Sequence, residues 1–302
     1  MSILKSLARV TVLMFIPLFL TACQDQSEST NFDAPEVEPL NEHDLLIAKQ
    51  VADFGLDAGE VTDEDRAIYG ARAGFFEWTE SLKRPPTADK DWRSVLGDHL
   101  ADAEPMWSQA FEELIVRDYF EDKRGGFFLD VGCYRPKNNS TTYYLERMLG
   151  WNGIGIDAME KYADPWAKHR PGSKFISYAV SDTDGDTVTF HIGNFANSLD
   201  EDTISDFGGK VREIEVTTMT LNTILEENGI EKVDFLSMDI EGAEPMALRG
   251  FDIQRYKPDL CCVEASASQE VLDYFAANGY ELIEKYKKVD KINSYFRPKS
   301  GA

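Results

Sequence analysis

The stretch that decides the fold begins with Phe127-Phe128-Leu129-Asp130-Val131-Gly132-Cys133 and ends with Gly153-Ile154-Gly155-Ile156-Asp157-Ala158. Each end is a short apolar run that stops at an acid. Between them, residues 140–149 have the pattern of a helix, which Gly150-Trp151-Asn152-Gly153 breaks. Strand, loop, helix and strand at this spacing predict a βαβ unit, and the two strands of such a unit are parallel.

Strand and helix patterns alternate through the rest of the C-terminal half. The predicted strands are 174–180, 187–192, 211–217, 233–238 and 259–263, and the predicted helices are 159–169, 221–228 and 266–278. Residues 281–286 and 291–297 are expected to form a closing hairpin. This alternation predicts an α/β protein with a doubly wound sheet.

The first 23 residues have the pattern of an export signal. Lys5 and Arg9 precede an apolar stretch, Val10 to Leu20, which is shorter than the roughly 20 residues that span a membrane. Leu20-Thr21-Ala22-Cys23 resembles the lipobox of bacterial lipoproteins, in which the cysteine becomes the lipidated first residue. We therefore expect a membrane-anchored lipoprotein on the periplasmic side of the bacterial cell envelope. An uncleaved signal anchor is the alternative.

Composition divides the rest of the chain into three parts. Residues 24–40 are rich in Ser, Glu, Pro and Asp and predict a linker. Residues 41–122 predict a helical N-terminal extension, with a third helix over 105–120. The main domain is expected over 123–302.

Charge and cysteine content exclude some classes of function. The formal net charge is −23, so nucleic acid and anionic membrane surfaces are poor partners, whereas a cationic or neutral ligand fits. Cys133, Cys261 and Cys262 have no paired spacing, so we expect buried reduced thiols rather than a disulfide framework.

Five predicted strands end in an acid, namely Asp130, Asp157, Asp182, Asp239 and Glu264. The carboxyl ends of parallel strands meet at one edge of the sheet, where ligands of such sheets bind. Carboxylates there can accept hydrogen bonds from ribose hydroxyls and attract a sulfonium charge. Because the glycine fingerprint of dinucleotide sites and the P-loop are both missing, S-adenosylmethionine fits better than a nicotinamide cofactor.

Helix capping is the alternative role for each of these acids. We favour ligand binding for Asp130 and Asp157, because they are the two acids of one βαβ unit. For Glu264 alone, helix capping is favoured. The following helix is expected to begin with a capping box of Ser266 and Gln269.

Several motifs resemble the FkbM-type methyltransferases, and the resemblance covers about 127 to 266 in register. The motifs are Asp130-Val131-Gly132, Asn139-Ser140-x-Thr142, Leu145-Glu146, Gly150-Trp151-x-Gly153-Ile154-x-Ile156-Asp157, Arg170-Pro171, Ala179-Val180-Ser181-Asp182, Ser198, Leu248-Arg249-Gly250-Phe251 and Pro258 to Glu264. The most specific piece runs from Val233 to Glu244 and contains Asp-Phe-Leu-Ser-x-Asp-x-Glu-Gly-x-Glu.

The resemblance implies a Rossmann-like class I methyltransferase fold, S-adenosylmethionine as the cofactor, and O-methylation of a small molecule or of a sugar or glycan hydroxyl. The cofactor-binding residues that it implies are Asp130 and Gly132 at the methionine part, Asp157 at the ribose, Ser181 and Asp182 near the adenine, and Asp239 facing the sulfonium. Ser140 is a further expected cofactor-binding residue. The first loop departs from the family pattern, because it has Arg135-Pro136 and no second glycine.

Methyl transfer to a hydroxyl requires alignment of donor and acceptor and removal of the hydroxyl proton. We expect Asp239 to be the catalytic base, with Glu241 as the second choice. A divalent metal on Asp239, Glu241 and Glu244 is an alternative that we rank below a metal-free site. The family is usually cytoplasmic, so the export signal raises a second hypothesis, a catalytically inactive methyltransferase-like binding module on an envelope lipoprotein.

Overall fold

The computed structural model describes residues 88–103, 107–137, 139–193, 197–199, 211–264 and 268–300. The expected signal peptide over 1–23, the expected linker over 24–40 and the first expected helices of the extension lie outside these ranges. Within the described ranges, no helix combines the length and the apolar character that a membrane crossing requires.

The expected βαβ unit is confirmed. It consists of β1 (Phe127–Val131), α4 (Tyr143–Leu149) and β2 (Asn152–Asp157), and the two strands pair in parallel with Leu129 beside Ile154. Gly150 ends α4 in the left-handed conformation, with φ +70°, and its N–H donates to the carbonyls of Leu145 and Glu146. Glycine reaches this conformation without a Cβ penalty, which explains where the helix stops.

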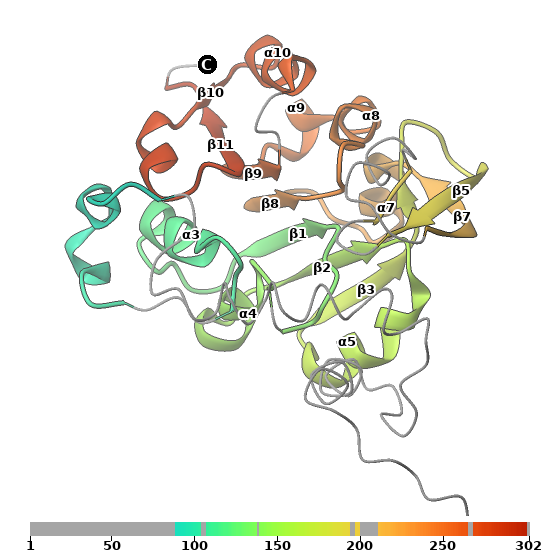
Figure 1. The fold of residues 1–302 in the computed structure, drawn as a ribbon, viewed down its shortest axis with the longest axis horizontal. Coiled ribbons are helices and arrows are strands. Elements are labelled where there is room, and N and C mark those ends of the chain that lie inside the picture. The colour runs from blue at the N-terminus through green and yellow to red at the C-terminus, as the bar shows by residue number, and fades with distance from the viewer. Residues whose placement is uncertain are drawn as a thin grey trace, which may run out of the picture. The chain divides into compact units, whose positions relative to one another are not determined.

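The unit lies within a seven-stranded sheet of order β10-β11-β9-β8-β1-β2-β3 (Figure 1). The remaining strands are β3 (Ser173–Ser177), β8 (Phe235–Met238), β9 (Leu260–Glu264), β10 (Tyr280–Leu282) and β11 (Asn293–Pro298). Only β11 runs against its neighbours, so the expected closing hairpin of β10 and β11 is confirmed. The chain moves outward from β1 to β3 and then returns to β8, so a topological switch point lies between β1 and β8.

A second, four-stranded sheet has the order β4-β7-β5-β6. It contains β4 (Ala179–Val180), β5 (Thr187–Ile192), β6 (Asn197–Ser198) and β7 (Arg212–Met219). The prediction of one strand over 174–180 was wrong, because the chain leaves the main sheet after Ser177 and pairs with β7 from Ala179. Asp182 therefore follows a strand of the second sheet and does not share the edge of the main one.

The helices are short and alternate with the strands. They are α3 (Glu112–Phe120), α5 (Ala163–His169), α7 (Leu221–Glu227), α8 (Glu244–Arg249), α9 (Ile253–Tyr256) and α10 (Gln269–Ala277), with 3₁₀ turns η1 (Trp92–Val95), η2 (Asp98–Leu100), η3 (Glu160–Tyr162) and η4 (Glu284–Lys288). The predicted helix over 105–120 begins only at Glu112, because Phe111 has φ +67° and interrupts the helical path. The predicted cap of α10 was also wrong, since Ser268 accepts the bond from the Val271 N–H.

The core has a cluster on each side of the main sheet. On β1, Leu129 and Val131 join the cluster that contains α7 and α10 residues, whereas Phe128 joins the cluster that contains α3 and α4 residues. Successive strand residues point to opposite faces, so Asp130 shares the face of Phe128. The three cysteines described are free and buried, as expected.

Candidate functional site

A pocket with about 950 Å³ of empty space, including its open mouth, lies at the carboxyl ends of the central strands. Gly132 follows β1 at its wall, Asp157 ends β2, and Asp239 and Glu241 follow β8. The position is the switch point where ligands of doubly wound sheets bind. Four of the eight site residues predicted from the sequence thus line one pocket.

Gly132 allows the main chain of two strand ends to meet at the pocket wall. It has φ +80°, and a Cβ at this position would lie 1.8 Å from the carbonyl oxygen of Asp239. Its own N–H donates to the carbonyl oxygen of Ile156 at 2.8 Å. Any side chain here would push β1 and β8 apart, so the glycine fixes the spacing of the elements that carry Asp157 and Asp239.

Asp157 joins the ends of β1 and β2 while facing the pocket. Its Oδ2 accepts from the Tyr134 N–H at 3.1 Å, and its Oδ1 accepts from the Met159 N–H at 2.9 Å. These bonds fix the orientation of the carboxylate. Each oxygen of an ionised carboxylate has a further lone pair, so Asp157 can still accept bonds from ligand hydroxyls.

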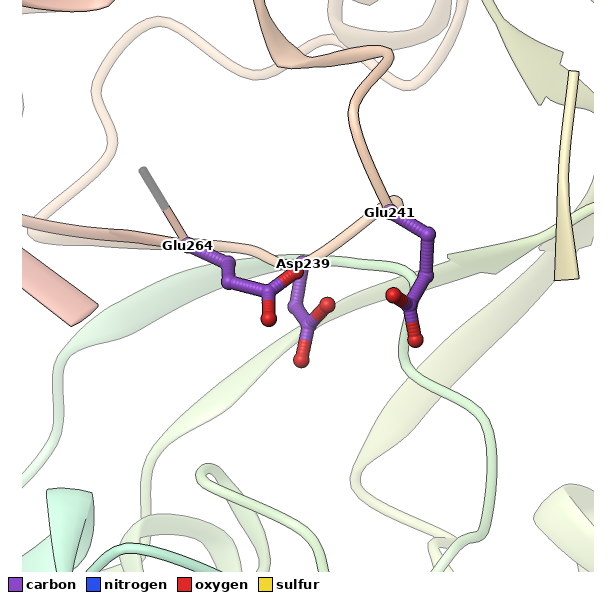
Figure 2. Close-up of side chains that lie close together, drawn as sticks. All are labelled: Asp239, Glu241 and Glu264. Carbon is purple, nitrogen blue, oxygen red and sulfur yellow. The ribbon is translucent and has the colours of Figure 1, made fainter. Parts of the chain in front are cut away.

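Three carboxylates converge at the other side of the pocket. One oxygen of each of Asp239, Glu241 and Glu264 lies within 4.8 Å of the others, and Figure 2 shows Asp239 between the two glutamates. The capping role that the sequence suggested for Glu264 is therefore wrong, because its side chain turns toward Asp239 and Ser268 caps α10 instead. These three are also the described residues whose oxygens could hold a metal ion together.

The loop that carries Asp239 and Glu241 is held by a fourth acid. Glu244 is buried, and its Oε1 accepts from the Ile240 N–H at 2.9 Å while its Oε2 accepts from the Gly242 N–H at 3.1 Å. Ser198 donates to the carbonyl oxygen of Glu241 at 2.8 Å. In the structure, Glu244 therefore shapes the loop, and the third acid of the cluster is Glu264.

Crowding of like charges shifts the protonation of this cluster. The Asp239 side chain keeps contact with solvent, yet the pocket surrounds it with protein atoms. This loss of water, together with the charge of Glu264 and a hydrogen bond with it, raises the pKa of Asp239 well above its usual range. Burial, followed by the charge of Glu241, raises the pKa of Glu264 to about 7. Both shifts favour a proton held within the cluster, and a bound cation would oppose them.

Asp130 and Ser140 are not among the residues that line the pocket. Asp130 Oδ2 accepts from the Thr142 hydroxyl at 2.6 Å, and the fully buried Arg170 donates to the hydroxyls of Thr142 at 3.0 Å and Ser140 at 3.2 Å. The Arg170 Nε also donates to Glu146 Oε2 at 2.6 Å. We call these five residues the Arg170 network. It supports the loop between β1 and α4, so a cofactor contact by Asp130 or Ser140 stays a prediction.

Ser181 and Asp182 also lie outside the pocket lining, although Ala179 and Val180 of the same motif line it. Asp182 Oδ2 accepts from the Arg249 Nε at 2.8 Å, which ties β4 to α8. Their assignment to the adenine is likewise a prediction that the structure leaves open.

Sequence reasoning missed several pocket residues. They include Gln109, Tyr134, Asn139, Tyr178, Phe190, Asn197 and Leu199. Asn139 lies within a quoted motif, so its position carried a signal. Gln109 precedes every motif by some distance, and nothing in the local sequence indicates that it reaches the pocket.

Comparison with known proteins places these residues in a family. Residues 130–282 match the family model described as the methyltransferase FkbM domain. The chain belongs to the FkbM methyltransferase family. The resemblance found in the sequence is thereby confirmed, and the pocket lies almost wholly within the matched residues. A search of curated proteins found no match.

Solved structures of similar fold are S-adenosylmethionine-dependent methyltransferases of low sequence identity. A TehB-like enzyme from Corynebacterium glutamicum is 15% identical, with 69% of this chain and 94% of that chain covered and a TM-score of 0.37. An enzyme from Thiobacillus denitrificans in complex with S-adenosyl-L-homocysteine is 12% identical, with 67% and 77% covered and a TM-score of 0.32. One from Geobacter sulfurreducens, with the same ligand, is 11% identical, with 69% and 70% covered and a TM-score of 0.32. The expected class I methyltransferase fold is confirmed.

Proposed function

We propose that this FkbM-family methyltransferase transfers the methyl group of S-adenosylmethionine to an oxygen of a small-molecule or glycan acceptor. The observation that carries the proposal is the pocket at the switch point, which is bordered by Asp157 on one side and by the cluster of Asp239, Glu241 and Glu264 on the other. The methyltransferase class and the cofactor follow from the family, and the oxygen acceptor is our inference from the carboxylates.

The lining of the pocket suits this cofactor. Among the described residues that line it there is no lysine or arginine, so a pyrophosphate would find no cationic partner. Asp157 is positioned to accept bonds from ribose hydroxyls, and Tyr178 and Phe190 supply aromatic surface nearby. The acidic cluster attracts the positively charged sulfonium, whereas the product S-adenosylhomocysteine lacks that charge.

Two acids of the cluster are suited to accept the proton. Methyl transfer is an in-line displacement in which the acceptor oxygen attacks the methyl carbon and the sulfur leaves as a thioether. The hydroxyl proton must pass to a base, and we assign this role to Asp239, with Glu241 as the second choice. A bound sulfonium lowers the pKa of a nearby carboxylate, so cofactor binding would convert Asp239 into the ionised form that a base requires.

Calorimetric titration of the full-length chain in detergent with S-adenosylmethionine and S-adenosylhomocysteine tests the proposal. Both should bind, and Asp157→Ala should weaken both by about tenfold, because a charge-assisted hydrogen bond is worth about 1.5–3 kcal/mol. Glu227→Ala removes an exposed acid of α7 outside the pocket and should leave both affinities unchanged. Absence of binding to a folded protein would contradict the enzyme and leave the binding-module alternative.

We also propose that Cys23 anchors the protein in the bacterial cell envelope. The support is the sequence pattern alone, Leu20-Thr21-Ala22-Cys23 after an apolar stretch. Labelling of growing cells with an alkyne fatty acid should mark the wild-type chain and not Cys23→Ser. Label in both variants, or in neither, would contradict the anchor and remove the reason for considering an envelope binding module.

A further inference from the structure

A segment outside the FkbM domain contributes to the pocket. Gln109 lines it, although the domain begins only at residue 130. Bonds on both sides hold the segment in place. Glu112 Oε2 accepts from the Ala110 N–H at 2.6 Å, and Glu113 Oε2 accepts from the Trp107 N–H at 3.2 Å. The position of Gln109 is therefore determined by the start of α3, where Phe111 turns the chain.

The segment lies beside α4. The ring of Trp107 packs on Tyr143, the first residue of α4, with 4.9 Å between the ring centroids. Asn139 lies in the loop that leads into the same helix and also lines the pocket. Two residues with amide side chains thus line the pocket from the α4 side, whereas Tyr178, Ala179 and Val180 line it from the β3–β4 side.

The side-chain amide of Asn139 is a hydrogen-bond donor without an acceptor. Its Nδ2 is enclosed by the protein and has no hydrogen-bond partner among the described residues. Asn139 has φ +58°, a backbone conformation that asparagine tolerates better than most residues. A buried donor without a partner destabilises the empty pocket, and a ligand that brings an acceptor removes this cost.

The amino-acid end of S-adenosylmethionine carries such an acceptor, its carboxylate. The three acids at the cluster repel a carboxylate, and the described lining offers no lysine or arginine to receive it. Gln109 and Asn139 bring amide N–H groups to the α4 side, and such groups can donate to a carboxylate without adding charge.

We propose that Gln109 and Asn139 together bind the carboxylate of the cofactor, so that the segment before the FkbM domain completes the cofactor site. This inference rests on the proposed function, because it presumes that S-adenosylmethionine occupies the pocket. It assigns a binding role to a residue outside the family's domain and predicts that the domain alone binds the cofactor more weakly than the longer chain.

Two ligands separate this assignment from a general disturbance of the pocket. S-adenosylhomocysteine has the carboxylate, whereas 5′-methylthioadenosine has the same adenosine and sulfur without the amino-acid end. Calorimetric titration of the full-length chain in detergent should show that Gln109→Ala weakens S-adenosylhomocysteine about tenfold, as the loss of one bond to a charged group does. The affinity for 5′-methylthioadenosine should not change.

Two further variants sharpen the result. Gln109→Glu should weaken S-adenosylhomocysteine more than Gln109→Ala, because it sets a negative charge against the carboxylate. Asn139→Gly removes the amide and keeps a residue that accepts the positive φ, and it should show the same selective loss. Asp157→Ala serves as the contrast, because it should weaken both ligands.

The outcomes distinguish this inference from the proposed function. Unchanged S-adenosylhomocysteine affinity in the Gln109 and Asn139 variants overturns the inference and leaves the proposed function standing. Equal loss of both ligands in a variant that melts like the wild type also overturns it. Failure of the wild-type protein to bind either ligand would contradict the proposed function itself.

Discussion

The motifs of the FkbM domain supply two groups of acids, and the groups differ in whether a cationic side chain lies beside them. In the Arg170 network, the buried guanidinium pairs with Glu146 and lies near Asp130, which accepts from the Thr142 hydroxyl, so a cation offsets acidic charge within the protein. In the cluster of Asp239, Glu241 and Glu264, the carboxylates approach one another and no cationic side chain lines the pocket beside them in the described residues. The first group stabilises the fold, whereas the second lowers its charge by binding a proton or a cationic ligand.

The largest expected effect on stability comes from removing the cation of the Arg170 network. Arg170→Met leaves Glu146 and Asp130 buried beside a neutral side chain, and breaking a buried ion pair on one side costs about 3–5 kcal/mol. Denaturant unfolding measures the change. Arg147→Met, at an exposed arginine of α4 next to Glu146, is the matched control and should cost less than about 1 kcal/mol. Equal losses in the two variants would remove the contrast between the groups.

A smaller effect is expected from neutralising one acid of the pocket cluster. The pKa of Glu264 is raised from its usual value to about 7, so the folded state binds a proton that the unfolded state releases above about pH 4.5. The free energy of unfolding should therefore decrease as the pH rises from about 5 to 7.5, by on the order of 2 kcal/mol from this group.

Glu264→Gln removes that part of the decrease and should leave the rest. Glu112, whose pKa burial raises to about 8, contributes a decrease of the same sign and remains in the variant. Unfolding measured at pH 5 and at pH 7.5 in both proteins gives the difference. Equal changes in the two proteins over this range would show that Glu264 binds no extra proton in the folded state.

The smallest effect is expected at the exposed pair of Arg249 and Asp182. More than half of the Arg249 side chain is exposed to solvent, and exposed ion pairs contribute between zero and about 1 kcal/mol. Arg249→Ala should therefore change the unfolding free energy by less than about 1 kcal/mol. Cofactor affinity should also be measured in this variant. A tenfold or greater loss of affinity would favour a direct role for Asp182 at the adenine.

The sequence predicted the features that are local. The apolar runs of β1 and β2, the glycines that end helices, and the acids at strand ends all act within a few residues, and the structure contains them. The alternation of side chains along β1 also predicts that Asp130 shares a face of the sheet with Phe128. This placement separates Asp130 from the acids of the pocket. The pattern alone did not show what packs on that face.

Features that depend on distant parts of the chain were missed. The division of the predicted strand at Tyr178 depends on pairing with β7, which comes more than thirty residues later. Glu264 turns toward Asp239 of a neighbouring strand rather than toward its own following helix. Gln109 lines the pocket because the segment before α3 packs on α4 through Trp107 and Tyr143, and no short sequence window contains both parts.

The buried thiols have a consequence for an exported protein. Burial raises the pKa of Cys133, Cys261 and Cys262 well above the usual range, so almost no thiolate is present to react. An oxidising environment attacks thiolates that it can reach, and the folded domain offers it none among these three. In the envelope location that we propose, resistance to oxidation would therefore depend on how quickly the chain folds after export, and slow-folding variants should accumulate mixed disulfides even when their mature stability is unchanged.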